Sequence, residues 1–323
     1  MRSMLIRRLL QFPLVLLAVY VVTFLLMTAA PGNPLESADS KVPPEVRHEQ
    51  EKVYGLDKPW YIQGLLYPAA IVKHLARGEV YLGCSVSYKG KPVADILGLT
   101  AATWSTGAVR TSLMLGLTAL ALAVLAGVHL GVWAAVRRNQ AVDHLAMGVA
   151  VIGVSVPPFV TGALLIGLLA IAVPLFPVGG WGRLSQLVLP AITLALPFTA
   201  YIARLMRAGM LDVLGADYVR TARAKGVAER RVIYTHAFKL AFLPVLSYLG
   251  PAAAAILTGS FVVEELFAIP GVGQHFVSSV LNRDYQLILA TVLLYATMLV
   301  TFNLLVDLAY AFVDPRIRRE GKP

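Results

Sequence analysis

Six long apolar windows constrain this chain more than any other feature of its sequence. Each is near or above the roughly 20 residues that an α-helix needs to cross the hydrocarbon core of a bilayer. A helix satisfies its own backbone hydrogen bonds in lipid, so each window predicts a transmembrane helix. The six predicted spans are Leu9 to Ala30, Ser112 to Val136, Met147 to Val173, Leu187 to Leu205, Pro244 to Phe267 and Leu287 to Phe312.

The composition supports an all-α polytopic membrane protein. Of the 323 residues, 58% are hydrophobic and 14% are charged, against about 45–50% and 25% in soluble domains. The pI is about 9.8, but basic residues beside spans follow from insertion topology and need no nucleic-acid partner. The single cysteine, Cys84, cannot form an internal disulfide, and no Cys/His cluster has metal-ligand spacing. We therefore expect neither a metal nor another cofactor.

The distribution of Lys and Arg predicts the orientation of the spans. The first window follows a basic N-terminus, as in a signal peptide, but its core is too long and no small-residue cleavage site stands out, so it predicts a retained span. Basic residues gather in the segments that lie inside if both termini are cytoplasmic. We therefore expect a multi-pass protein of the inner (plasma) membrane. The basic residues of the segments expected inside are Arg2, Arg7, Arg8, Arg137, Arg138, Arg316, Arg318, Arg319 and Lys322, with eight more from Arg204 to Lys239.

One long segment, from Pro31 to about Arg110, would then lie outside. It contains turn signals at Pro43-Pro44 and from Lys89 to Pro92. Its amphipathic run from Trp60 to Leu75 could lie along the membrane surface. The segment could be a packed cap without a binding role, or it could face a receptor together with the turn from Pro270 to Tyr285.

Three features inside the spans bear on packing. Gly127 and Gly131 form a small-xxx-small face that allows close helix approach. His129 lies between them and is expected to bond to a neighbouring helix; a proton-relay role is the alternative. The pair Pro157-Pro158 must break or kink the third span, because proline lacks the backbone donor. Such a kink could belong to a translocation path or be purely architectural.

A basic stretch between the fourth and fifth spans does not match its apolar surroundings. We expect Asp217 to cap a short helix that ends at Lys225, with Gly226 in the left-handed position after it. A second helix would run from about Ala228 into Pro244. Two faces are expected: Tyr218, Ala222 and Lys225 on the first helix, and Val232, Ile233, His236, Ala237 and Leu240 on the second. The corner could dock another protein, or anionic lipid headgroups could hold it at the interface.

The stretch Asp217-Tyr-Val-Arg-Thr-Ala-Arg-Ala-Lys-Gly226, followed by Leu243-Pro244, resembles the cytoplasmic "EAA" loop of permease subunits in binding-protein-dependent ABC importers. Its form is similar to that of the dipeptide, oligopeptide and nickel branch, and the nearest match is the B-type permease. Other motifs extend the resemblance over nearly the whole chain. They are Ile6-Arg-Arg-Leu-Leu10, Pro31-Gly-Asn-Pro34, Gly55-Leu-Asp-Lys-Pro59, Met210-Leu-Asp-Val-Leu214, Pro270-Gly-Val-Gly273, Arg283-Asp-Tyr285, Asn303-Leu-Leu-Val-Asp307 and Asp314-Pro-Arg-Ile-Arg318.

The resemblance implies the type I ABC importer permease fold. It also implies that the importer takes up di-/oligopeptides or a related small solute. It implies four kinds of partner: a second homologous permease, two ABC ATPase subunits, an extracytoplasmic solute-binding protein and membrane lipid. The chain would not be an enzyme, since no G-x-x-x-x-G-K-[ST] occurs in it and the ATPases would hydrolyse ATP. The implied ATPase-coupling residues are Asp217, Tyr218, Arg220, Thr221, Ala222, Lys225 and Gly226.

The same resemblance divides the chain into four parts. Residues 1–30 would be the first span, 31–107 the extracytoplasmic segment, 108–313 the permease core with the coupling loop 217–244, and 314–323 a cytoplasmic tail. The sequence departs from the family pattern in two regions. Arg220 and Thr221 stand where the general motif has Glu and Ala, so the Glu contact is not carried over. The run Gly98 to Gly107 resembles an insertion, and Cys84 replaces an expected Gly-rich turn, which leaves substrate and receptor specificity open.

Two other function classes fit the sequence less well than a permease does. A membrane enzyme would need a catalytic constellation, but neither H-E-x-x-H nor G-x-S-x-G occurs. A channel or proton-coupled transporter would place ionisable residues deep in its spans. Only Asp307, with Asn303 a turn earlier, and Glu264-Glu265 come near, and they are expected close to span ends. The sequence does not name the cargo among dipeptides, longer peptides, nickel chelates and sugars.

Overall fold

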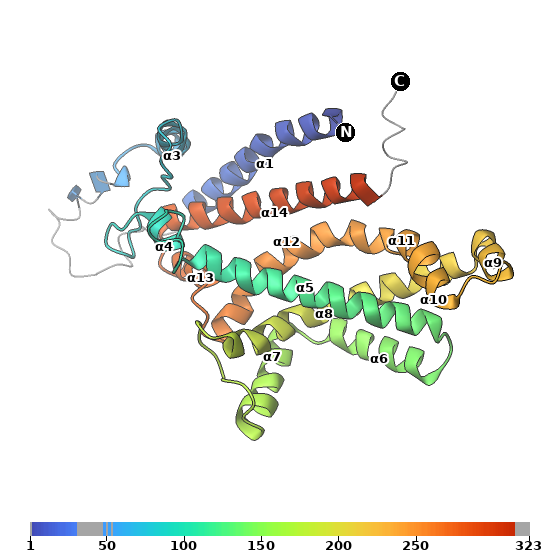
Figure 1. Ribbon diagram of the computed structural model, residues 1–323. Coiled ribbons are helices and arrows are strands. Elements are labelled where there is room, and N and C mark those ends of the chain that lie inside the picture. The colour runs from blue at the N-terminus through green and yellow to red at the C-terminus, as the bar shows by residue number, and fades with distance from the viewer. Residues whose placement is uncertain (1, 31–47, 50, 53, 314–323) are drawn as a thin grey trace. The chain divides into compact units, whose positions relative to one another are not determined.

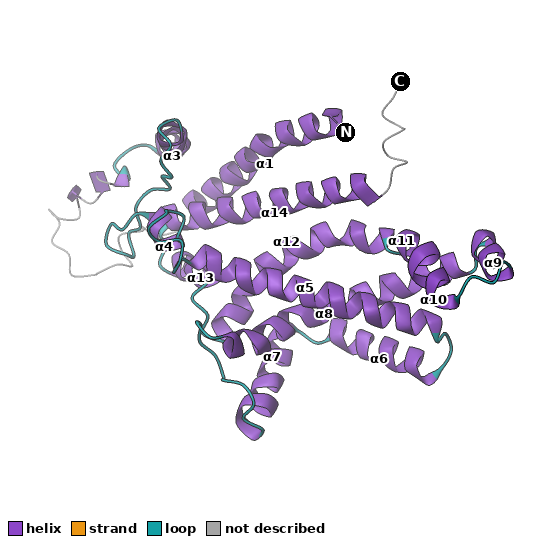
Figure 2. Cartoon of the chain, in the orientation of Figure 1, coloured by secondary structure: helices purple, strands orange, loops and turns teal. Residues whose placement is uncertain are grey.

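The computed structural model describes residues 2–30, 48–49, 51–52 and 54–313, and most of them are helical (Figure 1). Within these ranges the β pairing is limited to an isolated bridge between Cys84 and Pro92, and the other residues outside the helices form loops and turns (Figure 2). The predicted all-α class is confirmed. The expected tail 314–323 and the turn at Pro43-Pro44 lie outside the described residues.

Four helices in the described part of the chain are long and apolar enough to cross a membrane. Each corresponds to a predicted window, with ends that differ by a few residues. The exception is the fourth window, where the helix continues well beyond the expected Leu205 toward the basic loop. The four helices are α1 (Arg2–Ala29), α5 (Ala108–Val136), α8 (Leu184–Leu214) and α14 (Tyr285–Val313).

The other two windows form bent helix pairs, and counting each pair as one span gives six spans in the described residues. In the first pair, α6 (Ala141–Ser155) meets α7 (Pro158–Ile166), which continues as the π-helical η1 (Gly167–Ala172), at 107°. The predicted break at Pro157-Pro158 is confirmed. Val156 and Pro157 have ψ angles of 125° and 142°, because a residue before proline is pushed out of the helical region. In the second pair, α12 (Leu243–Leu266) meets the preceding helical turns at 51°.

The chain divides into two compact units. The first comprises residues 1–6, 114–268 and 299–323, and the second comprises residues 7–113 and 269–298. Helix α8 is the centre of the first unit and packs against α6, α7, α12 and α11 (Phe238–Ala241). Its inward side is apolar and fully buried at Leu189, Leu194, Ile202, Met206 and Met210.

Glycines allow α5 to approach α8 within the first unit. A Cβ on Gly127 would lie 2.8 Å from the carbonyl oxygen of Thr199, and one on Gly131 would lie 2.6 Å from that of Ala203. The small-xxx-small prediction is therefore confirmed as a helix-packing face. His129, between the two glycines, contacts the Leu125 carbonyl of its own helix through Nδ1 at 2.7 Å. The expected bond to a neighbouring helix was wrong, because the side chain lies on the exposed side of α5.

A buried ion pair joins α6 to α8. The Arg207 guanidinium donates to both carboxylate oxygens of Asp143, with Nη2 at 2.7 Å from Oδ2, and Asp143 is only 1% exposed. The backbone N–H of Asn139 also donates to this carboxylate. The pair fixes the start of α6 against α8 in a region where an unpartnered charge would be costly.

The second unit contains much of the segment that was expected outside, with α3 (Trp60–Leu75), α4 (Val93–Leu97) and α13 (Val272–Leu281). Its core includes Val93, Leu97 and Leu287. The fully buried Asp284 carboxylate accepts hydrogen bonds from the Ser85 hydroxyl and the Ser87 backbone N–H. The segment is therefore attached to the start of α14.

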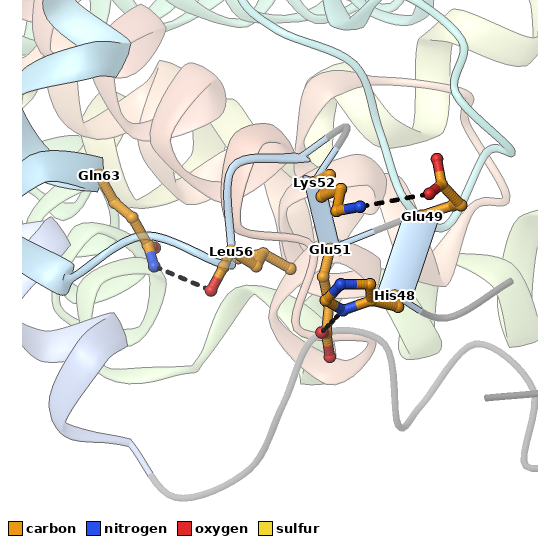
Figure 3. Close-up of polar contacts among 6 residues, drawn as sticks. All are labelled: His48, Glu49, Glu51, Lys52, Leu56 and Gln63. Atoms are coloured by element: carbon orange, nitrogen blue, oxygen red, sulfur yellow. Dashed lines mark hydrogen bonds and ion pairs between the residues drawn. The ribbon is translucent and has the colours of Figure 1, made fainter. Parts of the chain in front are cut away.

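The loop before α3 is held by weak polar contacts at the surface (Figure 3). Gln63 at the start of α3 donates from Nε2 to the Leu56 carbonyl at 3.4 Å and to the Lys58 carbonyl at 2.7 Å. Before them in the chain, Lys52 and Glu49 form an exposed ion pair at 3.4 Å.

The run from Gly98 to Gly107 closes on itself. These two glycines meet so closely that a Cβ on Gly98 would lie 2.2 Å from the Cα of Gly107. The run that resembles an insertion is thus a closed loop.

Candidate functional site

The basic stretch forms a helical corner, as predicted, beyond the C-terminal end of α8 (Figure 1). Helix α9 (Asp217–Ala224) ends at Lys225, and Gly226 has a φ of +73°. The Gly226 N–H donates to the Arg223 carbonyl at 2.9 Å, and the Val227 N–H donates to the Ala222 carbonyl at 3.2 Å. This bonding pattern is the Schellman motif, which requires the left-handed residue after the helix.

The start of α9 differs from the prediction. Ala216 occupies the N-cap position, and no side chain caps the helix. Asp217 is instead the first helical residue, because the chain turns into the helix one residue earlier than expected. Its carboxylate still lies near the positive end of the helix dipole, and it pairs with Arg220 at 3.6 Å in an exposed position.

The second helix of the corner contains a π-helical turn that the sequence did not indicate. It runs through α10 (Glu229–Arg231), η2 (Val232–Ala237) and α11 before α12 begins. Val232, Ile233 and Ala237, which were expected to recur at helical spacing, are buried. His236 and Leu240, which were expected to recur at the same helical spacing, are exposed. The wider turn rotates the following residues, so the apolar face continues through Ala241.

Two contacts attach the corner to α8. Arg223 donates to both carboxylate oxygens of Glu229 across the corner, at 2.7 and 3.1 Å, and to the Leu214 carbonyl at 3.4 Å. This hydrogen bonding raises the pKa of Arg223 above its usual value. Gly209 of α8 lies so close to α11 that a Cβ would be 2.5 Å from the Ala241 carbonyl oxygen. A displacement of the corner would therefore act directly on α8.

The residues predicted to couple to the ATPases present an exposed surface. Val219 is fully buried and Ala222 is half-buried, so these two residues attach α9 to the unit. The others project outward, with Tyr218 at 45% exposure. The exposed members of the predicted set are Asp217, Tyr218, Arg220, Thr221, Lys225 and Gly226.

This end of the first unit also contains a polar cavity of about 300 Å³, lined by Arg138, Leu214, Arg223, Glu229 and four other residues. Its charged groups are Arg138 and the Arg223–Glu229 pair. Within the described residues, no group of three or more His, Cys, Asp or Glu side chains is placed to hold a metal ion. The corner is thus a short exposed helix that two contacts attach to a long span.

Sequence reasoning missed several polar contacts of the first unit. Asp143 and Arg207 are 64 positions apart, and no local pattern connects them. Glu264, which was expected near a span end, is fully buried and accepts a hydrogen bond from Ser260. The Arg223–Glu229 pair could have been anticipated, because opposite charges flank the Gly226 corner.

These features define a class of protein: a multi-pass helical membrane protein with a basic corner between two spans. The comparisons with known proteins identify its family. Residues 127–319 match the family described as "Binding-protein-dependent transport system inner membrane component". This range includes α6 to α12, the corner and α14. The chain belongs to this family, and it is a permease subunit of a binding-protein-dependent ABC importer.

The similar proteins match over their full length. The oligopeptide transport system permease protein OppB of Haemophilus influenzae is 39% identical over 98% of this chain and 100% of its own length. The protein of the same name from Salmonella typhimurium is 41% identical over the same shares. The dipeptide transport system permease protein DppB of Bacillus subtilis is 38% identical over 100% of both chains. In one solved structure, "Crystal structure of an amino acid ABC transporter with histidines", a chain matches with a TM-score of 0.49 at 20% identity, over 63% of this chain and 91% of that chain.

Proposed function

We propose that this chain, together with a second homologous permease, forms the membrane pathway for uptake of dipeptides or oligopeptides. The support is the full-length similarity to permeases whose names specify those substrates. Two separate ABC ATPase subunits drive the transport, and an extracytoplasmic solute-binding protein delivers the cargo. The chain itself hydrolyses no ATP.

The proposed ATPase-docking residues are the exposed part of the corner. Asp217, Tyr218, Arg220, Thr221, Lys225 and Gly226 contact the ATPase, while Ala222 attaches α9 from behind. The observation that carries this proposal is the mechanical attachment of the corner. The Arg223 contacts and the close approach of Gly209 to α11 would transmit a push on α9 to α8. Movement of packed helices about such an attachment is a common way to open and close a pathway.

The proposed topology places both termini, the corner and the tail 314–323 in the cytoplasm. Residues 1–30 are the first span, 31–107 an extracytoplasmic segment that faces the solute-binding protein, and 108–313 the permease core. The concentration of basic residues at the corner supports this orientation, since Lys and Arg favour cytoplasmic loops.

Uptake by reconstituted vesicles tests the proposed function. The chain is co-reconstituted with its second permease, both ATPases and the binding protein, and entry of a labelled tripeptide is followed with and without ATP. We expect saturable uptake only when ATP and all subunits are present. Saturable, ATP-independent uptake by this chain alone would show that it is an autonomous transporter and would refute the proposal.

A further inference from the structure

A second cavity in the first unit, of about 550 Å³, lies between the last turns of α5 and the π-turn of the corner. Its volume is within the range of about 300–1,000 Å³ that is typical of ligand sites. Almost all of its lining is apolar or aromatic, and none of the lining residues is acidic. The lining residues are Val128, His129, Leu130, Val132, Trp133, Val136, Ile233, Tyr234 and Phe238.

A basic side chain lies beside this apolar cavity. The guanidinium carbon of Arg137 is 5.3 Å from the centre of the Trp133 ring, which lines the cavity and is 50% exposed. A cation above the indole face is held there by a cation–π interaction. Two acidic side chains at the same end of the unit already pair with arginines, Asp143 with Arg207 and Glu229 with Arg223. Arg137 thus provides a positive charge beside an aromatic residue that lines the apolar site.

The cavity lies along the last turns of a candidate membrane span. Helix α5 is a candidate span that ends at Val136, and Arg137 follows immediately. Tryptophan and tyrosine at the end of a span are typical of the membrane interface, where the ring contacts both hydrocarbon and headgroups. Trp133 and Tyr234, which is 56% exposed, are at this position. An occupant that enters from the side would therefore come from the bilayer.

We propose that the cavity binds a phospholipid with an anionic headgroup. An acyl chain packs against Val128, Val132 and Ile233, and the phosphate-bearing headgroup lies beside Arg137. One wall of the cavity is η2, so the bound lipid contacts the same loop that is proposed to receive the ATPase. This inference rests on the proposed function in one respect, the assignment of the site to the cytoplasmic leaflet.

Photolabelling of the assembled transporter tests the site. The complex is placed in phosphatidylcholine bilayers that contain a small fraction of phosphatidylglycerol or of phosphatidylcholine with a diazirine in the acyl chain. Mass spectrometry then measures the carbene adducts on residues 128–136 and 232–238. We expect about fivefold more labelling by phosphatidylglycerol, the effect of one basic side chain near an anionic headgroup.

Two variants distinguish a specific site from general surface charge. Arg137→Gln should bring the ratio of phosphatidylglycerol to phosphatidylcholine labelling close to one. Arg138→Gln removes the same charge from the neighbouring residue, which lines the other cavity, and it should leave the ratio unchanged. The phosphatidylcholine arm of each variant shows whether the cavity itself is still formed.

Three results would overturn the proposal. Equal labelling by the two lipids would mean that bulk lipid fills the cavity without selection. An equal loss of preference in both variants would assign the preference to surface potential. Labelling of the isolated chain that disappears in the assembled transporter would mean that another subunit covers the cavity. None of these readouts depends on transport, so failure of the lipid site and failure of the coupling role remain distinguishable.

Discussion

Replacing Gly226 with valine would test whether the shape of the corner is needed to dock the ATPases. Gly226 has a φ of +73°, and a Cβ built on it meets no atom within 4 Å. A substitution therefore produces no steric clash, and its cost comes from the left-handed backbone alone. For a β-branched residue that cost is about 1–3 kcal/mol.

The penalty should act on the corner and leave the spans unchanged. Helix α9 has eight residues, and its end depends on the two hydrogen bonds that the left-handed residue permits. A cost of about 1–3 kcal/mol lowers the equilibrium constant between the docking conformation and other conformations of the corner roughly 5- to 150-fold. We expect Gly226→Val to reach the membrane at near wild-type abundance, while ATPase co-purification and peptide uptake fall together.

Two matched variants control for the backbone effect. Gly226→Asn should retain most docking, because asparagine tolerates the left-handed region better than other residues. Gly78→Val, in the segment expected outside, carries the same penalty at a φ of +77° and also meets no atom within 4 Å. It should leave ATPase co-purification intact. Normal co-purification and uptake in Gly226→Val would refute the coupling role, and loss of that variant from the membrane would make Gly226 a folding residue.

Three further predictions concern packing, the buried ion pair and topology. Gly209→Ala should destabilise the purified protein by about 1–3 kcal/mol, because its Cβ overlaps a backbone carbonyl of α11. Gly148→Ala, inside α6, meets no atom within 4 Å and should raise the thermal midpoint slightly, because alanine favours the helix. Arg207→Gln should cost about 1–3 kcal/mol, because it removes the charge-assisted hydrogen bonds to Asp143 and leaves that carboxylate with the Asn139 N–H; an unchanged midpoint would show that water replaces the lost partner. An impermeant maleimide should label Cys84 from outside intact spheroplasts. The labelling should be slow and should speed up as pH rises, because burial raises the pKa of the thiol and lowers its thiolate fraction. Labelling only from inside would invert the proposed topology.

The sequence predicted the features that depend on local composition. Apolar windows locate the spans because a helix in lipid needs length and hydrophobicity and little else. Pro157 and Pro158 predict a break because they remove backbone donors, although the size of the bend depends on what surrounds the break. Gly226 predicts the corner because few other residues adopt a positive φ without strain.

The remaining features depend on contacts that no short pattern contains. The cap at Ala216 instead of Asp217 is a shift of one residue, and helix ends are the least certain part of a prediction from sequence. The second corner helix was expected to keep a regular period of 3.6. The π-turn interrupts that period, so Ala241 is buried while Leu240 is exposed. Asp143 and Arg207 pair because α6 packs on α8, and only the tertiary structure brings them together.

Site-specific photocrosslinking from Tyr218 would test the central claim most directly. Tyr218 is exposed on α9, and a benzophenone amino acid in its place should contact whatever docks on the corner. In the assembled transporter in native membranes, we predict crosslinks to an ATPase subunit that are absent when the same amino acid replaces Trp60, an exposed residue of the segment expected outside. Crosslinks from Tyr218 only to lipid, or only to the second permease, would contradict the claim that this corner receives the ATPase.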